Sequence, residues 1–135
     1  MKVVIDTNVI VSALMNTNGI PAKILTLIFN GKIKLLYDNR ILFEYIDLLS
    51  RKEFGFPNEI INDMIDYFKK DGEFINAEYN KKIFSDETDK KFYEVYKSGE
   101  AKYLITGNIK HFPKEDKIVI PKYFMQIYDK NILQN

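Results

Sequence analysis

The sequence predicts an α/β fold of three layers, α/β/α, around a central, mostly parallel sheet. Short apolar runs rich in β-branched residues alternate along the chain with segments whose apolar residues recur at helical spacing. The first run, residues 3–5 (Val-Val-Ile), is apolar at consecutive positions, which is typical of a strand buried on both faces of a parallel sheet. A length of 135 residues, 46% of them hydrophobic, fits a single domain over residues 1–135.

The first half of the chain alternates strand, two helices, strand and helix. The first strand stops at Asp6, and the apolar spacing that follows predicts a helix. A second helix over residues 21–29 begins with Pro21, which is tolerated in a first turn, and Gly31 suits its end. Residues 33–37 form the second predicted strand, after which Asp38 or Asn39 can cap a helix. The predicted buried face of that helix consists of Leu42, Tyr45, Ile46 and Leu49.

The second half continues the alternation. A helix follows residues 57–58 and ends at Gly72, and residues 73–76 predict a short strand. Asp86 opens a further helix that ends near Gly99, and strands over residues 103–106 and 118–120 follow. Pro121 starts the last helix. The apolar face of the helix after residue 58 consists of Ile61, Met64, Ile65 and Phe68, and the pattern favours it as core over an interface with another protein.

Composition excludes several kinds of functional site. A formal net charge of +1 excludes the strongly basic surface of many nucleic-acid-binding domains, although not a local basic patch. The absence of cysteine excludes thiol nucleophiles and cysteine zinc sites, and one histidine, His111, excludes a multi-histidine metal site. Carboxylates, hydroxyls and lysines remain for chemistry.

Acidic and amide side chains from distant parts of the sequence are expected at one edge of the sheet. Asp6 follows the first strand, Glu44 lies early in the helix after the second, and Asn108 follows the strand over residues 103–106. Asp86 and Asp89 begin the helix before that strand. Because sites in open parallel sheets form at the carboxyl ends of strands, these residues should converge. Each one alone also suits a turn or helix cap, but a cluster of carboxylates favours Mg²⁺ or Mn²⁺, which prefers oxygen ligands.

Several segments together resemble PIN-domain nucleases, and among these the toxins of toxin–antitoxin systems. The opening run of residues 3–9 is similar to the family's first strand and aspartate, and Glu44 within residues 41–45 matches its helix-borne glutamate. Residues 48–54 resemble the end of the same helix, and residues 86–92 resemble the segment that supplies the third acid. Residues 103–108 match the strand carrying Thr and a final Asp or Asn.

The resemblance implies a metal-dependent endoribonuclease that hydrolyses phosphodiester bonds of single-stranded RNA. Asp6, Glu44 and Asp89 would hold Mg²⁺ or Mn²⁺, with Asn108 as a neutral ligand or orienting group and Asp89 favoured over Asp86 as the third ligand. The expected outer shell consists of Thr7, Asn8, Asp86 and Thr106, where Thr106 fixes Asp6 or Asn108 by hydrogen bonding. The expected RNA-binding cations are Arg40, Arg51, Lys52 and Lys110.

Departures from the family pattern leave alternatives open. Asn108 stands where many relatives have Asp, Lys90 occupies a position that is often acidic, and His111 lies where some relatives place another acid. A catalytically weak PIN fold acting as an RNA-binding or scaffold module is therefore an alternative. A phosphatase-like Mg²⁺ domain is disfavoured, because it needs a second Asp where Asn8 stands.

The resemblance also implies partners. We expect a cognate antitoxin that inserts a basic side chain near the acids, and a homodimer formed through apolar helices. No apolar run approaches the length needed to cross a bilayer, and the N-terminal residues lack the pattern of a signal peptide, so a cytoplasmic protein is expected.

Overall fold

The computed structural model describes residues 1–134, and its centre is a parallel sheet of five strands. The strand order is β3-β2-β1-β4-β5, so β1 lies in the middle, between β2 and β4. The strands are β1 (Lys2–Ile5), β2 (Lys34–Tyr37), β3 (Glu73–Phe74), β4 (Tyr103–Ile105) and β5 (Ile118–Val119).

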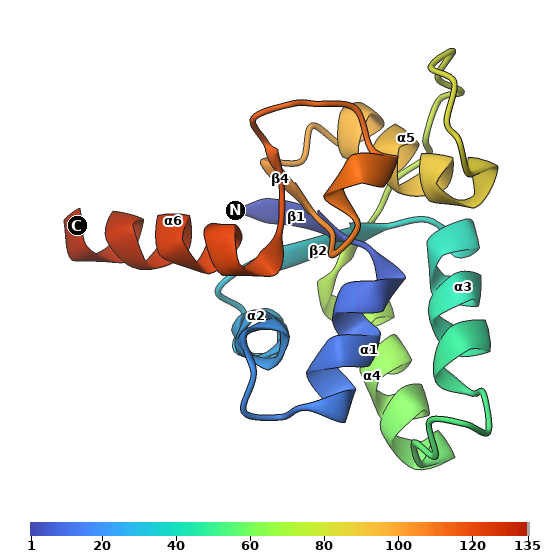
Figure 1. The fold of residues 1–135 in the computed structure, drawn as a ribbon. Helices are drawn as coiled ribbons and strands as arrows, with labels where there is room; N and C mark the ends of the chain where they lie inside the picture. The colour runs from blue at the N-terminus through green and yellow to red at the C-terminus, as the bar shows by residue number, and fades with distance from the viewer. Residues whose placement is uncertain (135) are drawn as a thin grey trace.

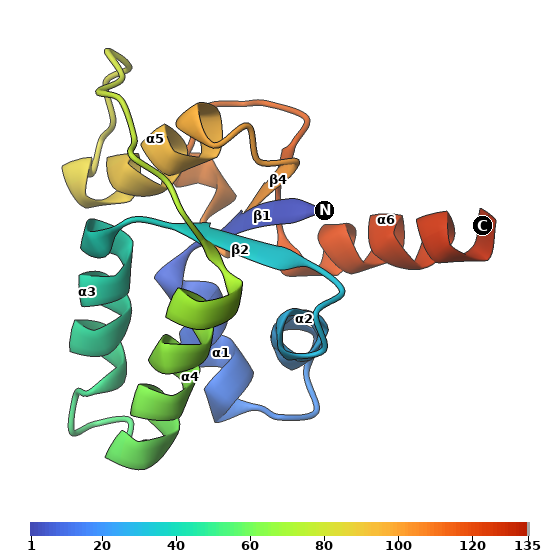
Figure 2. The same ribbon diagram turned by 180° about the vertical axis from the view of Figure 1, so that it is seen from behind.

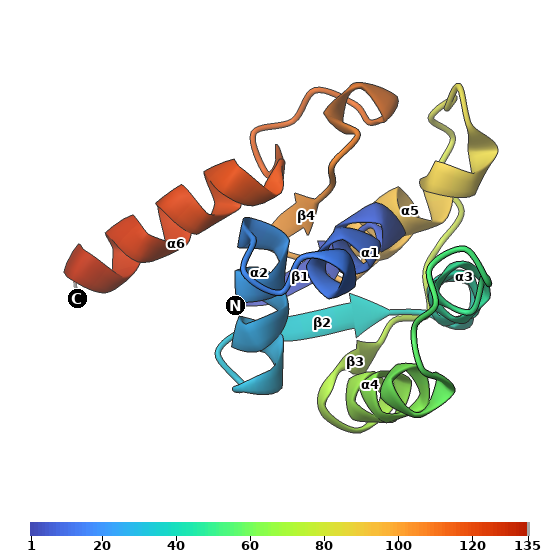
Figure 3. The same ribbon diagram turned by 60° about the horizontal axis from the view of Figure 1, so that its bottom comes forward.

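Helices cover both faces of this sheet. Figure 1 shows α5 above the sheet and α1, α2, α3 and α4 below it, and the reverse view in Figure 2 agrees. Figure 3 shows α6 projecting from the body beside α2. The helices are α1 (Thr7–Met15), α2 (Ile20–Phe29), α3 (Asn39–Leu49), α4 (Asn58–Asp71), α5 (Lys90–Ser98) and α6 (Pro121–Gln134), with 3₁₀ turns η1 (Glu87–Asp89) and η2 (Ile109–His111). The predicted three-layer α/β/α class is confirmed.

The core explains why the apolar runs form these elements. The central strands are buried on both faces, because Val3, Val4 and Leu104 have no exposed surface. The predicted face of α4 is buried throughout, so it is core. None of the helices within residues 1–134 is both long and apolar enough to span a bilayer.

Two boundaries differ from the sequence prediction by more than one residue. The helix expected from Asp86 begins at Lys90, because Asp86 caps η1 instead by accepting a hydrogen bond from the backbone N–H of Thr88. The strand expected over residues 73–76 pairs with β2 only at Glu73 and Phe74. The helix expected to end within residues 48–54 does end there, at Leu49, and tight turns follow it.

One predicted core position was wrong. Ile46 is 36% exposed, whereas the buried residues of α3 are Ile41, Leu42, Tyr45 and Leu49. The buried stripe includes Ile41 in place of Ile46, so it is turned slightly toward Ile41 and leaves Ile46 at its flank.

The carboxyl ends of the central strands meet at one edge. At the right of Figure 1, α1 begins after β1, α3 begins after β2, and the short segment before α5 passes nearby. The topology therefore collects the starts of these helices, and the loop after β4, around one region of the surface.

Candidate active site

A cleft of about 390 Å³ opens at this edge of the sheet. It brings together four residues that the sequence placed on separate elements, namely Asp6, Glu44, Asp89 and Asn108. Thr7 and Asn8 also line it. The remaining lining residues are Val11, Ser12, Leu48, Phe54 and Thr88.

Asp6 is the most buried acid of the cleft. It directly follows β1, its backbone N–H donates to the carbonyl of Ile105 at 2.9 Å, and the residue is 5% exposed. The pKa of Asp6 is raised to about 6, chiefly by burial and also by the charges of Asp89 and Glu44, against the lowering effect of a hydrogen bond from Thr106. A carboxyl group held in this way favours a bound cation, because a cation stabilises its charged form.

Thr106 links the loops after β1 and β4. Its buried hydroxyl donates to Oδ2 of Asp6 at 2.8 Å and accepts from the backbone N–H of Asn108 at 2.9 Å. Asn8 adds a second link, since its Oδ1 accepts from the backbone N–H of Gly107 at 3.1 Å. These contacts hold Asp6 and Asn108 in fixed relative positions.

Glu44 projects from α3 into the cleft and is paired there. One carboxylate oxygen accepts from the hydroxyl of Thr7, and Oε1 accepts from Nζ of Lys91 at 2.7 Å. Lys91 belongs to α5, is largely buried, and also donates to the carbonyl of Thr88. The sequence analysis missed Lys91, and no local pattern separated it from the other lysines of the chain.

The structure distinguishes the two aspartates before α5. Asp89 is half-buried and lines the cleft, and its Oδ2 lies 3.1 Å from Nδ1 of His111. Burial raises the pKa of Asp89 despite the hydrogen bond with His111. Asp86 is exposed, and its Oδ1 accepts from the backbone N–H and the hydroxyl of Thr88. Asp86 therefore acts as a cap outside the set of residues that line the cleft.

The side chains predicted to bind RNA differ in whether they already form ion pairs within the protein. Arg40 pairs with Asp38 at 2.7 Å and with the buried carboxylate of Glu94 at 2.8 Å, so its guanidinium joins α3 to α5. Arg51 lies 3.6 Å from Asp47. Lys52 and Lys110 are exposed and form no ion pair within the described part of the chain.

The oxygen atoms that could ligate a metal in the cleft belong to carboxylates and an amide, which are the kinds of ligand that a hard divalent cation prefers. Among residues 1–134, however, no three acidic or histidine side chains lie close enough together to hold one ion. Mg²⁺ commonly binds through one or two carboxylates and keeps several waters, so the separation of these acids is compatible with partly water-mediated binding.

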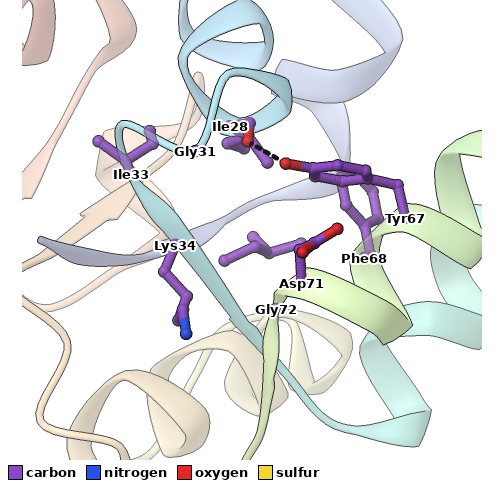
Figure 4. A pocket seen from close by; sticks show the side chains of 9 residues that line it. Ile28, Gly31, Ile33, Lys34, Tyr67, Phe68, Asp71 and Gly72 are labelled. Carbon is purple, nitrogen blue, oxygen red and sulfur yellow. Dashed lines mark hydrogen bonds between the residues drawn. The ribbon is translucent and has the colours of Figure 1, made fainter.

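A second cavity, of about 230 Å³, lies at the other end of β2 (Figure 4). It is bounded by the start of β2 at Lys34 and the end of α4 at Asp71 and Gly72. The hydroxyl of Tyr67 donates to the carbonyl of Ile28 at 2.9 Å beside it. Because sites of parallel sheets form at the carboxyl ends of strands, this cavity is a weaker candidate than the acidic cleft.

Comparison with known families identifies the fold. The sequence profile described as the PIN domain matches residues 2–110, which include every acid of the cleft. The chain belongs to the PIN-domain family. It is also 38% identical over 152 aligned positions to an uncharacterized protein of Methanocaldococcus jannaschii, covering 98% of this chain and 94% of that protein.

Membership of the PIN-domain family points to a nuclease-type function, that is, hydrolysis of phosphodiester bonds in RNA. Nucleases of the PIN-domain family usually use divalent metals such as Mg²⁺. The acidic cleft at the carboxyl edge is the part of this PIN domain with side chains suited to that chemistry.

Proposed function

We propose that this protein is a Mg²⁺- or Mn²⁺-dependent endoribonuclease that cleaves single-stranded RNA in the acidic cleft. The observation that carries the proposal is the convergence of Asp6, Glu44, Asp89 and Asn108 on that one cleft from four separate segments. A structural role as helix caps would not require these residues to line a common cavity.

Each residue of the cleft has a proposed task. Asp6 and Asp89 hold the cation, and Glu44 contacts it directly or through water. A bound divalent cation lowers the pKa of a coordinated water and offsets negative charge on the phosphate under attack. Thr106 orients Asp6, and Asn108 orients the phosphate or a water. Thr7 holds the carboxylate of Glu44 in place, while the amide of Asn8 fixes the loop after β4.

A matched pair of charge substitutions tests the assignment of the third acid. Asp89→Asn and Asp86→Asn each remove one negative charge from the same segment, but only Asp89 lines the cleft. We expect Asp89→Asn to lower Mg²⁺-dependent cleavage of a single-stranded RNA by about 100-fold, and Asp86→Asn to change it by less than about threefold. Equal losses in both variants would remove Asp89 from the proposed metal site.

Lys91 provides a second test, because its ammonium competes with a metal ion for Glu44. Lys91→Met should lower the free energy of unfolding of the metal-free protein by about 1–2 kcal/mol, between the values for exposed and buried ion pairs. It should also tighten Mg²⁺ binding by about tenfold, because a positive charge leaves the cleft.

Lys97→Met is the control for Lys91. Lys97 lies on the same helix as Lys91, forms a 2.9 Å ion pair with Glu115 and does not line the cleft. Isothermal titration with Mg²⁺ and urea unfolding should show that Lys97→Met loses stability without a change in Mg²⁺ affinity. Unchanged Mg²⁺ affinity in Lys91→Met would contradict the proposed competition for Glu44.

We further propose that the protein acts in the cytoplasm as the toxin of a toxin–antitoxin pair. The negative charges of the cleft suit a basic side chain of an antitoxin inserted between them. Apolar residues exposed on α6, including Tyr123 and Leu133, support association of two copies. Sedimentation over a range of concentrations tests the homodimer, and co-expression with the product of a small adjacent reading frame tests inhibition.

The competing function is a catalytically weak PIN domain that binds RNA without cutting it. Asn108 favours this function, because a neutral side chain there reduces the charge available for metal ions. RNA binding by the wild-type protein without cleavage in Mg²⁺ or Mn²⁺ would establish that function in place of the nuclease.

A further inference from the structure

One aromatic ring lines the acidic cleft. Phe54 belongs to the connection between α3 and α4, and no other aromatic side chain within residues 1–134 lines this cleft. The ring is half-buried, and it adds apolar surface close to Asp6, Glu44 and Asp89. An apolar surface beside proposed metal ligands suits a ligand with an apolar part that contacts the ring and an anionic part that contacts the bound metal ion.

The ring of Phe54 packs against a second aromatic ring. It stacks on Phe56 with ring centroids 5.6 Å apart and an interplanar angle of 10°. Phe56 in turn packs against the hydrophobic core. Gly55 lies between them with φ 66°, a left-handed conformation that glycine adopts without strain. Phe54 is therefore held on a stacked pair anchored in the core.

Cations accompany the ring in the same turn. The backbone N–H of Phe54 donates to the carbonyl of Arg51 at 3.1 Å, and that of Gly55 donates to the carbonyl of Lys52 at 3.2 Å. The side chains of Arg51 and Lys52 are both exposed. An aromatic face together with exposed cations is the combination by which proteins hold unpaired nucleotides, with the base stacked and the phosphates neutralised.

We propose that Phe54 stacks on an unpaired base of the RNA substrate next to the phosphate that lies over the acids of the cleft. This inference rests on the proposed ribonuclease function and adds the binding site for a base. A base paired in a duplex stacks on its neighbours and is not free to lie on this ring, so Phe54 selects single-stranded RNA. Stacking tolerates any base, so the ring positions the strand without specifying its sequence.

Fluorescence tests the stacking directly, because the natural sequence contains no Trp. Phe54→Trp introduces one reporter in the cleft, and Phe74→Trp introduces a matched reporter at a half-exposed position on β3. The titrant is a short unstructured RNA in EDTA, with its binding followed by anisotropy of an end label. We expect quenching of Phe54→Trp fluorescence, reduced when one nucleotide of the RNA is abasic, and no quenching in Phe74→Trp. Saturated binding without quenching in Phe54→Trp would overturn the proposal.

Cleavage provides the second test. Phe54→Leu keeps an apolar side chain but removes the ring, and we expect kcat/KM on intact single-stranded RNA to fall about tenfold, mainly through KM. An RNA abasic at the stacked position should be cleaved equally by Phe54→Leu and wild type, and Phe54→Tyr should retain wild-type values. If wild type cleaves and Phe54→Leu matches it on intact RNA, the base site is wrong while the nuclease function stands. Absence of metal-dependent cleavage by wild type would overturn the nuclease function and the base site together.

Discussion

Asp6→Asn should abolish most metal-dependent cleavage and at the same time stabilise the metal-free protein. The cleavage rate should fall by about 100- to 1,000-fold, because the variant loses the most buried of the proposed metal ligands. The gain in stability follows from the pKa of Asp6, which burial raises from 3.8 to about 6. Between about pH 4 and pH 6 the folded protein binds the proton more tightly than the unfolded chain, so wild-type stability falls as the pH rises through this window.

An amide at position 6 has no charge to bury, so the variant does not lose stability as the pH rises through this window. At pH 7.5 the free energy of unfolding should therefore be greater in Asp6→Asn than in wild type by on the order of 2–3 kcal/mol, and the difference should vanish near pH 4. Urea unfolding in EDTA at the two pH values measures it. Mg²⁺ should stabilise wild type more than the variant, because a ligand stabilises in proportion to its affinity for the folded state.

Asp66→Asn is the control for Asp6→Asn, because Asp66 is exposed on α4 and does not line the cleft. It should leave both cleavage and the pH dependence of stability unchanged. Full cleavage by Asp6→Asn, or equal stabilisation of both proteins by Mg²⁺, would show that Asp6 does not bind the metal.

Thr106→Val should cause the second large effect, through a single hydroxyl. The substitution keeps the shape of a fully buried side chain but removes the donor to Asp6 and the acceptor of the Asn108 N–H. Loss of a hydrogen bond to a charged group and of a partner for a backbone N–H should cost about 2–4 kcal/mol of unfolding free energy. Because the hydrogen bond from Thr106 lowers the pKa of Asp6, its loss should also move the rising limb of the pH profile of cleavage to higher pH.

Thr106→Ser separates the hydroxyl from the methyl group. It retains both hydrogen bonds and loses one buried methyl group, so its cost should be about 1 kcal/mol and its pH profile should match wild type. Thermal unfolding and cleavage rates between pH 5 and pH 8 measure the effects. A pH profile unchanged in Thr106→Val would show that Thr106 has no part in positioning or tuning Asp6.

The sign of the change in unfolding free energy separates Asp6 from Thr106. Asp6→Asn should lose activity and gain stability, as expected of a site whose like charges repel one another without a cation. Thr106→Val should lose stability and, at low pH, cleavage activity, as expected of a residue that supports the site. Opposite signs of the stability change in the two variants would distinguish a proposed ligand from its support.

The sequence by itself determined the fold class and the elements that place the acids. The apolar run before Asp6 predicts a buried central strand, and the apolar spacing of residues 61–68 predicts a buried helix face. Both patterns follow from the repeat of a single element, which a linear sequence carries in full. The expectation that Asp6, Glu44 and Asn108 meet at one edge followed from the parallel topology alone.

Only the tertiary structure decided which side chains contact those acids. Lys91 lies 47 residues from Glu44 in the sequence, and no local pattern pointed to this contact. The hydrogen bond from Thr106 to Asp6, across 100 residues, was expected only from the family resemblance. The entry of Phe54 into the cleft depends on how the chain turns after α3, and the separation of Asp89 from Asp86 depends on the 3₁₀ turn η1. Periodicity describes each element by itself, whereas these contacts depend on how loops and neighbouring elements pack, because a side chain's partners are set by distance in space and not along the chain.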